Sequence, residues 1–292
     1  MNTANAIYYQ SHQSGNWNQT TTWETSATGV GPWTWPAAST PTSTDNSITI
    51  LSSHVVRITV SVTADEITVN AGGDLGTKGA AGLTVNDGGG VDLIIIGTFT
   101  DSSTANVTFS PASAKWLMGA TGTLIKYTQS SSNNWQNAYN GGITNIPATA
   151  FWICRRTGGI GPSLSTTFPG SGSVYPNLII ENYVSGTWNC DANTSTNFNG
   201  NTSAPTIKGS FVIGGASPVG CYVDFMNKQT NANPTKIQGL FLVQTGHTYR
   251  NHGTGTEVQG NVQIDGSLIY ASGQTPKFNF TGTNPPTVSG NG

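Results

Sequence analysis

The chain has 292 residues, with 11 Lys and Arg against 13 Asp and Glu, which gives a formal net charge of −2. Only 8% of the residues are charged, compared with about 25% in typical soluble domains. These values exclude the basic surface that nucleic-acid binding requires. The longest apolar run, which begins at Leu93, is too short to cross a bilayer, so no membrane insertion is expected.

The first 45 residues are rich in tryptophan. Four of the eight Trp side chains fall in this segment, at Trp17, Trp23, Trp33 and Trp35. Regular alternation of apolar and polar residues begins only at Ser47. We therefore predict that residues 1–45 form an aromatic N-terminal cap, which covers the first strands and blocks their exposed edge. The chain starts without the basic and apolar regions of a signal peptide.

From Ser47 onward the chain has the pattern of short strands separated by turns. Hydrophobic residues make up 35% of the chain and occur in short runs rich in Val, Ile, Phe and Trp, which is typical of strands. The segment "ITVNAGGDL" from Ile67 is repeated as "LTVNDGGGV" from Leu83. The sequence therefore predicts an all-β protein. Long polar and Gly-rich stretches predict a loop-rich insertion at about residues 129–175.

A motif of the form apolar-x-Gly-x-x-apolar recurs in the last third of the chain. Its copies begin at Ile207, Ile237, Val258 and Val288, at intervals of 30, 21 and 30 residues. Unequal intervals of this size are typical of a β-solenoid, in which each coil stacks on the previous one while the turns vary in length. We predict a right-handed parallel β-helix over residues 46–292. A β-sandwich is the main alternative, but it does not predict a recurring motif.

The repeats also predict which side chains point inward. The candidates for the aliphatic core are Ile207, Val212, Ile237, Leu242, Val258 and Ile264. The last segment, "VSGNG", begins a coil and supplies no cap. We therefore expect a truncated C-terminal coil that belongs to a longer protein, or an uncapped end that associates with another chain end to end.

Three cysteines, Cys154, Cys190 and Cys221, have no metal-type spacing. Cys190 and Cys221 lie about one repeat apart, which leaves a disulfide between them open. Buried thiols are the competing interpretation.

Several segments resemble a known family of surface proteins. "YYQSHQSGNWNQTTTWE" from Tyr8 and "PTSTDNSITILSSHVVRITVSVTADEITVNAGGDL" from Pro41 resemble the opening of large repeat-containing proteins of gliding, type IX-secreting bacteria. "YPNLIIENYVSGTW" from Tyr175 and "IQGLFLVQTG" from Ile237 resemble their downstream repeats. The resemblance implies a secreted adhesin or structural stalk built as a parallel β-helix, with a C-terminal sorting domain in the full protein. The family has no shared catalytic residues.

Acidic residues are too scattered to predict an enzyme. Glycoside hydrolysis needs two carboxylates within a few ångströms of each other. The only adjacent pair is Asp65 and Glu66, which we assign to a structural turn. We therefore predict a non-catalytic protein.

One polar cluster is a candidate for ligand contact. The segment "TGHTYRNHGTG" contains His247, Tyr249, Arg250 and His252. On a strand, alternation would place Tyr249 and Arg250 on opposite faces. A solvated turn is the competing interpretation.

Two oxygen-rich segments are weak candidates for Ca²⁺. "DANTSTNFNGN" offers Asp191 and Asn193, and "NDGGGVD" offers Asp87 and Asp92. The first segment lacks the Gly and Glu that complete a helix-loop-helix calcium site. Ordinary Asx turns are the competing interpretation. No other cofactor is expected.

The tryptophans are candidates for sugar contact, because exposed aromatic rings stack on sugars. The residues considered are Trp17, Trp33, Trp35 and Trp135. Packing in the cap or core is the competing interpretation. The most consistent function is a structural or adhesive segment of an extracellular cell-surface protein or filament, with surface glycans or other cell-surface proteins as partners. A carbohydrate-binding or polysaccharide-degrading β-helix is the alternative.

Overall fold

The computed structural model describes residues 7–127, 135, 138–156, 174–183, 188–189, 206–216, 221–224, 234–251, 255–270, 277–283 and 287–290. In these ranges the chain is all-β, apart from two single-turn 3-10 helices, η1 (Thr20–Thr22) and η2 (Ile143–Asn145). No described helix has the length and hydropathy needed to cross a bilayer. The chain divides into two compact units. Unit 1 comprises Met1–Ile125 and Asn133–Gly142, and unit 2 comprises Lys126–Ser132 and Ile143–Gly292.

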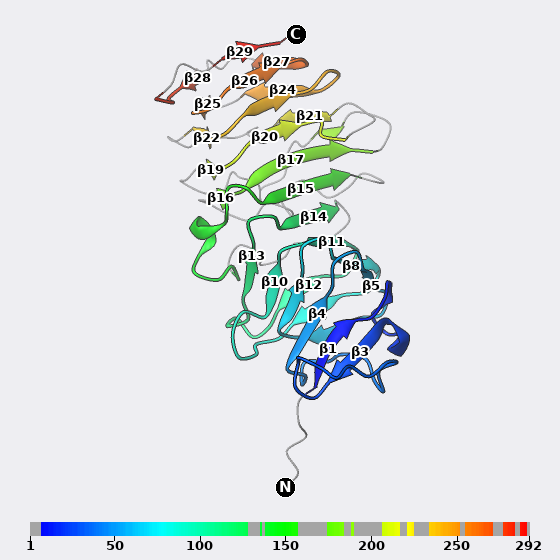
Figure 1. The fold of residues 1–292 in the computed structure, drawn as a ribbon. Coiled ribbons are helices and arrows are strands. Elements are labelled where there is room, and N and C mark those ends of the chain that lie inside the picture. The colour runs from blue at the N-terminus through cyan, green and yellow to red at the C-terminus, as the bar shows by residue number, and fades with distance from the viewer. Residues whose placement is uncertain are drawn as a thin grey trace. The chain divides into compact units, whose positions relative to one another are not determined.

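Unit 1 contains three sheets (Figure 1). The strands of the first sheet are β1 (Tyr8–Ser11), β3 (Trp23–Ser26), β4 (Ser47–Ile50), β7 (Ile67–Val69), β10 (Leu93–Ile95) and β13 (Trp116–Met118). The strands of the second are β2 (Gly15–Asn16), β5 (Val55–Ile58), β8 (Asp74–Gly79), β11 (Thr98–Ser103) and the start of β14 (Thr123–Tyr127). The strands of the third are β6 (Val62–Ala64), β9 (Leu83–Val85) and β12 (Val107–Phe109).

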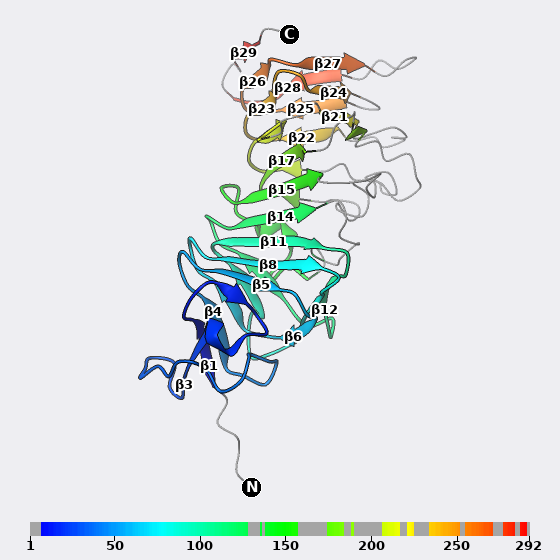
Figure 2. The same ribbon diagram turned by 90° about the vertical axis from the view of Figure 1, so that its right-hand side faces the viewer.

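From β4 the chain visits the three sheets in turn, so each strand of unit 1 from β7 onward pairs in parallel with the strand three places before it. Figure 2 shows β5, β8 and β11 side by side. The register is in phase with the alternation of side chains, since Ile48, Ile67 and Leu93 pair along the first sheet and are all fully buried. We call three consecutive strands, one from each sheet, a repeat. One repeat therefore buries its apolar face against the next.

Unit 2 also contains three sheets, and all their pairings are parallel. One consists of β15 (Phe151–Arg156), β17 (Asn177–Asn182), β20 (Phe211–Ile213), β23 (Phe241–Val243), β26 (Val262–Ile264) and β29 (Val288–Ser289). A second consists of β16 (Val174–Tyr175), β19 (Thr206–Ile207), β22 (Thr235–Ile237), β25 (Gly255–Val258) and β28 (Lys277–Phe280). The third consists of β18 (Trp188–Asn189), β21 (Cys221–Asp224), β24 (Thr248–Asn251) and β27 (Ser267–Tyr270).

The core of unit 2 is partly the one that the motif predicts. Ile207, Ile237 and Val258 pair in register and are at most 1% exposed. The prediction that Val212 and Leu242 point inward is wrong, because both lie on the outer face. Their neighbours fill the core instead: Phe211, Ile213, Phe241 and Val243. A shift of one residue exchanges the two faces of a strand. Ile264 pairs with the buried Val243 but remains partly exposed.

Glycines form a column at the corner between two sheets of unit 2. They are Gly209, Gly239, Gly260 and Gly282. A Cβ on Gly239 would approach the Gly209 carbonyl to within 3.0 Å, and a Cβ on Gly260 would meet the Gly239 carbonyl in the same way. Each glycine is therefore required by the close approach of the backbone of the preceding repeat.

This column corrects the assignment of the last motif copy. Phe280 pairs with Val258 and precedes Gly282, so the fourth corner begins at Phe280. Val288 pairs with Val262, which places it on the neighbouring sheet. The two motif copies that begin at Val258 and Val288 thus start on different sheets. A longer connection separates Phe280 from Val288 than separates Val258 from Val262.

The N-terminal segment packs onto the first repeat of unit 1. Strand β1 pairs in parallel with β4 and antiparallel with β3, and β2 pairs with β5. Trp17 and Trp23 are at most 1% exposed, with ring centroids 5.0 Å apart. Their N–H groups donate to the carbonyls of Pro41 and Trp17. Two large indoles are therefore buried with their polar atoms satisfied.

The region expected to be a loop-rich insertion also contains core and strand. Phe151–Arg156 forms strand β15, which pairs with β17 over its whole length. Trp135 lies in the core of unit 1, where its ring makes edge contacts with Phe99, Phe109 and Trp116 at 5.5, 5.2 and 4.9 Å. The region predicted to be loop-rich therefore contains one strand and a buried indole, whose apolar side chains stand among mostly polar neighbours in the sequence. Residues 157–173 lie outside the described ranges.

Among the cysteines, Cys154 is free and buried on β15. The question of a Cys190–Cys221 disulfide falls outside the described side chains.

Candidate functional site

Trp35 is the most exposed of the tryptophans whose side chains the structure describes. Its side chain is 48% exposed. The indole Nε1–H donates to the Thr21 carbonyl at 2.9 Å. The His12 imidazole stacks on the indole, with ring centroids 4.6 Å apart and an interplanar angle of 25°. The indole is therefore held by two contacts while much of its surface faces solvent.

Polar side chains from two strands support this arrangement. His12 Nδ1 lies 2.9 Å from Glu24 Oε2, and Gln10 Nε2 donates to Glu24 Oε1. Gln10 and Glu24 are directly opposite each other in the antiparallel β1–β3 pair. Strand alternation puts both on the same face. We call Trp35, His12, Glu24 and Gln10 the Trp35 cluster.

Sequence reasoning found only part of this cluster. Its aromatic ring makes Trp35 a candidate, whereas His12, Glu24 and Gln10 are not among the residues that the sequence motifs single out. The alternation in "YYQS" and "WETS" would have placed Gln10 and Glu24 on outward faces. The pairing of these two strands with each other was the missing information.

The other tryptophan candidates are less accessible. Trp17 and Trp135 are each 1% exposed, so the expectation of sugar stacking is corrected for both. They are buried because each indole makes edge contacts with other aromatic rings in the core of unit 1. Trp33 is partly exposed beside Gly31.

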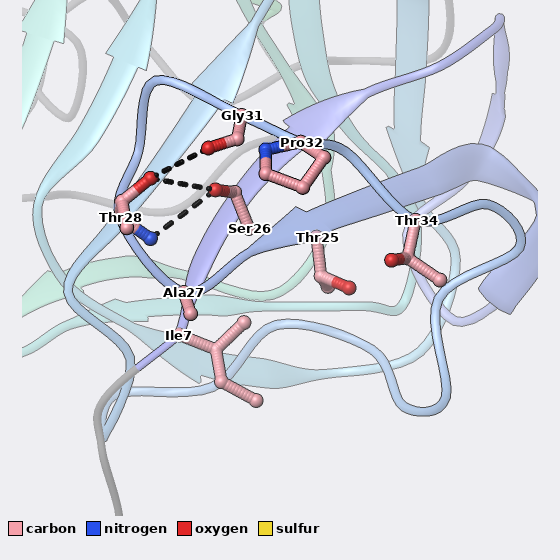
Figure 3. Close-up of a pocket in the computed structure, with 8 residues that line it drawn as sticks. All are labelled: Ile7, Thr25, Ser26, Ala27, Thr28, Gly31, Pro32 and Thr34. Atoms are coloured by element: carbon pink, nitrogen blue, oxygen red, sulfur yellow. Dashed lines mark hydrogen bonds between the residues drawn. The ribbon is translucent and has the colours of Figure 1, made fainter.

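A cleft of about 440 Å³ lies beside the same strands (Figure 3). Its lining is formed by Ile7, Thr25, Ser26, Ala27, Thr28, Gly31, Pro32 and Thr34. Thr28 Oγ1 donates to the Gly31 carbonyl at 2.8 Å, and the Thr28 N–H donates to Ser26 Oγ. None of the eight residues is titratable near neutral pH. The cleft therefore offers hydroxyl groups for hydrogen bonding and no acid–base chemistry.

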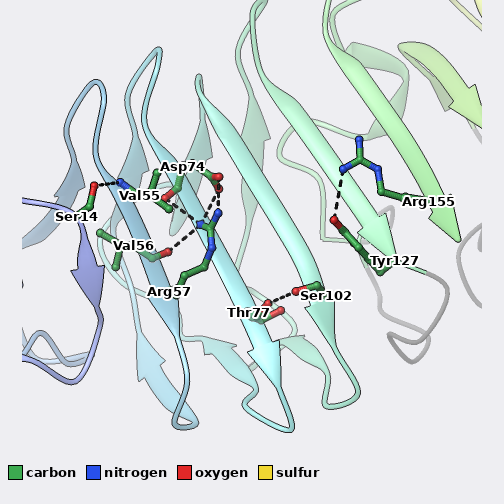
Figure 4. Close-up of polar contacts among 9 residues, drawn as sticks. All are labelled: Ser14, Val55, Val56, Arg57, Asp74, Thr77, Ser102, Tyr127 and Arg155. Atoms are coloured by element: carbon green, nitrogen blue, oxygen red, sulfur yellow. Dashed lines mark hydrogen bonds and ion pairs between the residues drawn. The ribbon is translucent and has the colours of Figure 1, made fainter. Parts of the chain in front are cut away.

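Charged pairs lie along the sheet faces. In unit 1, Arg57 binds Asp74 through two N–H···O contacts of 2.9 and 2.6 Å (Figure 4). In unit 2, Arg155 donates to Glu181 Oε2 at 2.7 Å and to the Tyr127 hydroxyl at 3.3 Å. The carboxylates of both pairs thus accept charge-assisted hydrogen bonds from guanidinium groups.

Arg155 also lies between two aromatic rings. Its guanidinium carbon is 5.7 Å from the centroid of Tyr127 and 5.0 Å from that of Tyr183. The sequence has no acidic residue close to Arg155 along the chain. The register of β15 with β17, which pairs Arg155 with Glu181, supplies one. This cluster is best explained as a cross-strand structural contact.

The candidates around His247 separate as alternation predicts. Tyr249 is buried on β24, and its hydroxyl bonds to Thr256 Oγ1 at 2.8 Å. Arg250 lies on the opposite face of that strand and is partly exposed. His247 is 5% exposed, and burial lowers the pKa of its imidazole. His252 lies outside the described residues. The three described members, His247, Tyr249 and Arg250, do not converge on one site.

The calcium candidates are occupied by other contacts where they are described. Both carboxylate oxygens of Asp92 accept backbone N–H groups, from Gly88 at 2.6 Å and Lys115 at 2.7 Å. Asp87 accepts from the Ser113 hydroxyl. Within the described ranges, no group of three or more His, Cys, Asp or Glu residues is arranged to hold a metal. Asp191 and Asn193 lie outside those ranges.

Asp65 is an unusual carboxyl group near this loop. It is 5% exposed, and its Oδ1 atom has no hydrogen-bond partner. Burial, followed by the nearby charges of Glu66, Asp92 and Asp45, raises the pKa of Asp65 from 3.8 to about 6. A group whose pKa is raised in the folded state destabilises the fold as the pH rises through that value.

We expect Asp65→Asn to stabilise unit 1 above pH 6. The asparagine removes a charge that costs up to about 2 kcal/mol when Asp65 is ionised. The gain in free energy of unfolding should therefore be present at pH 8 and absent at pH 4, where Asp65 is already protonated in the folded state. Urea denaturation at the two pH values measures it. An equal effect at both would contradict the charge argument.

No protein-family model, curated protein or solved structure matches the chain.

Proposed function

We propose that the chain is a right-handed parallel β-helix that acts as a non-catalytic structural and adhesive segment of an extracellular cell-surface protein. The observation that carries this proposal is the recurrence of in-register parallel strands on three sheets within each unit. Such stacking favours an extended surface built from many similar repeats, with turns that differ from one repeat to the next. An experimental density map at side-chain resolution would test the hand of the helix.

The chemistry of the exposed surface supports an adhesive role. Charged residues are few, and the net charge is −2, so a second surface meets little electrostatic repulsion. Exposed Asn, Ser and Thr side chains offer hydrogen bonds to glycans or to other cell-surface proteins. Many weak contacts of this kind give useful avidity when copies are displayed together.

The distribution of carboxylates supports a non-catalytic role. Glu24, Asp74 and Glu181 each pair with a basic or imidazole side chain. A glycosidase would instead hold one protonated and one ionised carboxyl across a sugar-binding groove. Asp65 has a raised pKa of about 6 near Asp92, but both side chains are at most 5% exposed. The resemblance of the N-terminal and repeat motifs to surface proteins of type IX-secreting bacteria supports secretion to the cell surface.

A bead-adhesion assay tests the proposal. Beads carrying the chain at high and low density are passed over surfaces coated with polysaccharides or with bacterial cells, and beads carrying heat-unfolded chain are the control. We expect retention at high density only, with no release of reducing ends or unsaturated sugars. Sugar release would indicate an enzyme, and absence of retention on every surface would contradict adhesion.

The purified chain in solution, without beads, tests self-association. Phe280 and Val288 are 44% and 61% exposed, although their partners in earlier strands, Val258 and Val262, are buried. We propose end-to-end association through these last strands as a further partner interaction. Light scattering should then give a mass that rises with concentration, and Phe280→Ser with Val288→Ser should abolish the rise. A constant monomer mass would contradict it.

A further inference from the structure

We propose that the Trp35 cluster is a binding site for a neutral saccharide, with the indole of Trp35 as the surface on which one pyranose ring stacks. The inference rests on the proposed adhesive function and names the ligand class of one site within it. It requires only residues of unit 1: Trp35, His12, Glu24 and Gln10.

The exposed indole is the first argument. Four tryptophans of unit 1, Trp17, Trp23, Trp116 and Trp135, are at most 1% exposed and Trp33 is partly exposed, whereas Trp35 is 48% exposed. Burial of a large aromatic side chain is favourable, since it removes a large apolar area from water. Much of the Trp35 indole faces solvent in the free protein, so a ligand that covers the indole gains hydrophobic free energy on binding.

The rigidity of the indole is the second argument. The hydrogen bond to the Thr21 carbonyl and the stacked His12 ring hold Trp35 in one orientation. A preorganised side chain loses little conformational entropy when a ligand covers it. The negative face of an aromatic ring attracts groups with partial positive charge. The C–H groups on one face of a pyranose ring have this character.

The polar groups at the edge of the indole are the third argument. Glu24 is 16% exposed and His12 is 40% exposed. Each carboxylate oxygen of Glu24 accepts one hydrogen bond within the cluster and retains capacity for another. Sugar hydroxyls both donate and accept, so they match a carboxylate, an amide and an imidazole that lie together.

The charge of the cluster selects a neutral sugar. Glu24 is its only acidic group, and its only basic partner is His12, which bonds to Glu24 itself. A uronic acid or sulfated sugar would place a second negative charge near Glu24 without a guanidinium or ammonium group to offset it. An apolar peptide would cover the indole but would also remove water from the Glu24–His12 pair, at a cost in desolvation.

Titration of the whole chain with oligosaccharides tests the site. The probes are neutral hexaoses of glucose, mannose, xylose and N-acetylglucosamine, with a hexamer of galacturonic acid as the charged comparison. Calorimetry and the change in tryptophan fluorescence report binding. We expect at least one neutral hexaose to bind with a Kd of roughly 0.1–1 mM, and Trp35→Ala to weaken it at least tenfold.

Two further variants make the result specific. Tyr270→Ala removes another aromatic side chain that is 53% exposed but belongs to unit 2, and it should leave the affinity unchanged. Glu24→Gln keeps the shape of the cluster and should weaken binding about threefold or more. Circular dichroism checks that each variant is folded, which the exposure of Trp35 makes the expected outcome.

Three results would overturn the proposal. The first is that no neutral hexaose binds at about 10 mM, which is tenfold above the weakest expected Kd. The others are that binding is unchanged in Trp35→Ala, or that only the galacturonic acid hexamer binds. Bead adhesion that persists in Trp35→Ala would overturn the site while leaving the proposed function in place.

Discussion

Replacing Gly97 with alanine is expected to lower the free energy of unfolding of unit 1 by about 3 kcal/mol. Gly97 lies at the corner between β10 and β11. A Cβ there would approach the carbonyl oxygens of Asn70 and Gly73 to within 3.0 Å. Both are backbone atoms, and the Gly73 carbonyl accepts the Thr98 N–H. Relief of the contact would therefore require moving the preceding repeat.

Urea denaturation followed by tryptophan fluorescence measures this change, because six of the eight tryptophans belong to unit 1. Gly90→Ala is the matched control, since a Cβ at Gly90 would meet no atom within 4 Å. It should change the free energy of unfolding by about 0.5 kcal/mol or less, in either direction. Equal losses for the two variants would show that the close backbone approach at Gly97 does not determine stability.

Trp135→Ala should remove about 3–5 kcal/mol from the stability of unit 1. The Trp135 ring contacts Phe99, Phe109 and Trp116, and its carbonyl accepts the Trp116 indole N–H. Truncation would leave a cavity among three aromatic rings that belong to different strands. Thermal and urea denaturation should both show the loss.

Trp135→Phe should cost less than the alanine variant. The Trp135 Nε1–H is buried without a hydrogen-bond partner, so phenylalanine removes an unsatisfied donor while it keeps part of the ring. Trp35→Ala serves as the exposed control for loss of an indole and should cost about 1 kcal/mol or less. A loss for Trp135→Ala no greater than for Trp35→Ala would place Trp135 outside the core.

The all-β class and the repeating strands were predictable because composition and the spacing of apolar residues can both be read from short stretches of sequence. Short alternating runs identify strands, and the recurring motif locates Ile207, Ile237 and Val258 at equivalent places. The faces of the adjoining strands were not predictable. A corner turn intervenes between Ile207 and Phe211, and its geometry decides whether Phe211 or Val212 points inward.

The division into two units and the role of residues 133–142 were also missed. Trp135 and Tyr139 stand in a polar stretch, and only their contacts with Trp116 assign them to the core of unit 1. Such contacts depend on tertiary structure and leave no periodic signal in the sequence.

The candidate site follows the same division between local and non-local information. The type and density of aromatic residues marked Trp35 as a candidate. The cluster itself depends on contacts between residues that are separated along the chain. These are the pairing of β1 with β3, the stacking of His12 on Trp35 and the hydrogen bond between His12 and Glu24. The exposed fraction that distinguishes Trp35 from Trp17 is likewise a property of the folded chain.

The glycine corners of unit 2 bear on how genes of this kind change in length. The links Lys208–Ser210, Gln238–Leu240 and Gln259–Asn261 have equal lengths, while the other connections differ. A recombination event that duplicates Gly239–Gln259 would insert β23, β24 and β25 together and keep every later strand in phase. A deletion of one codon within a corner would instead exchange inner and outer faces downstream. Alleles should therefore differ by whole repeats and by loop length, with the corners unchanged.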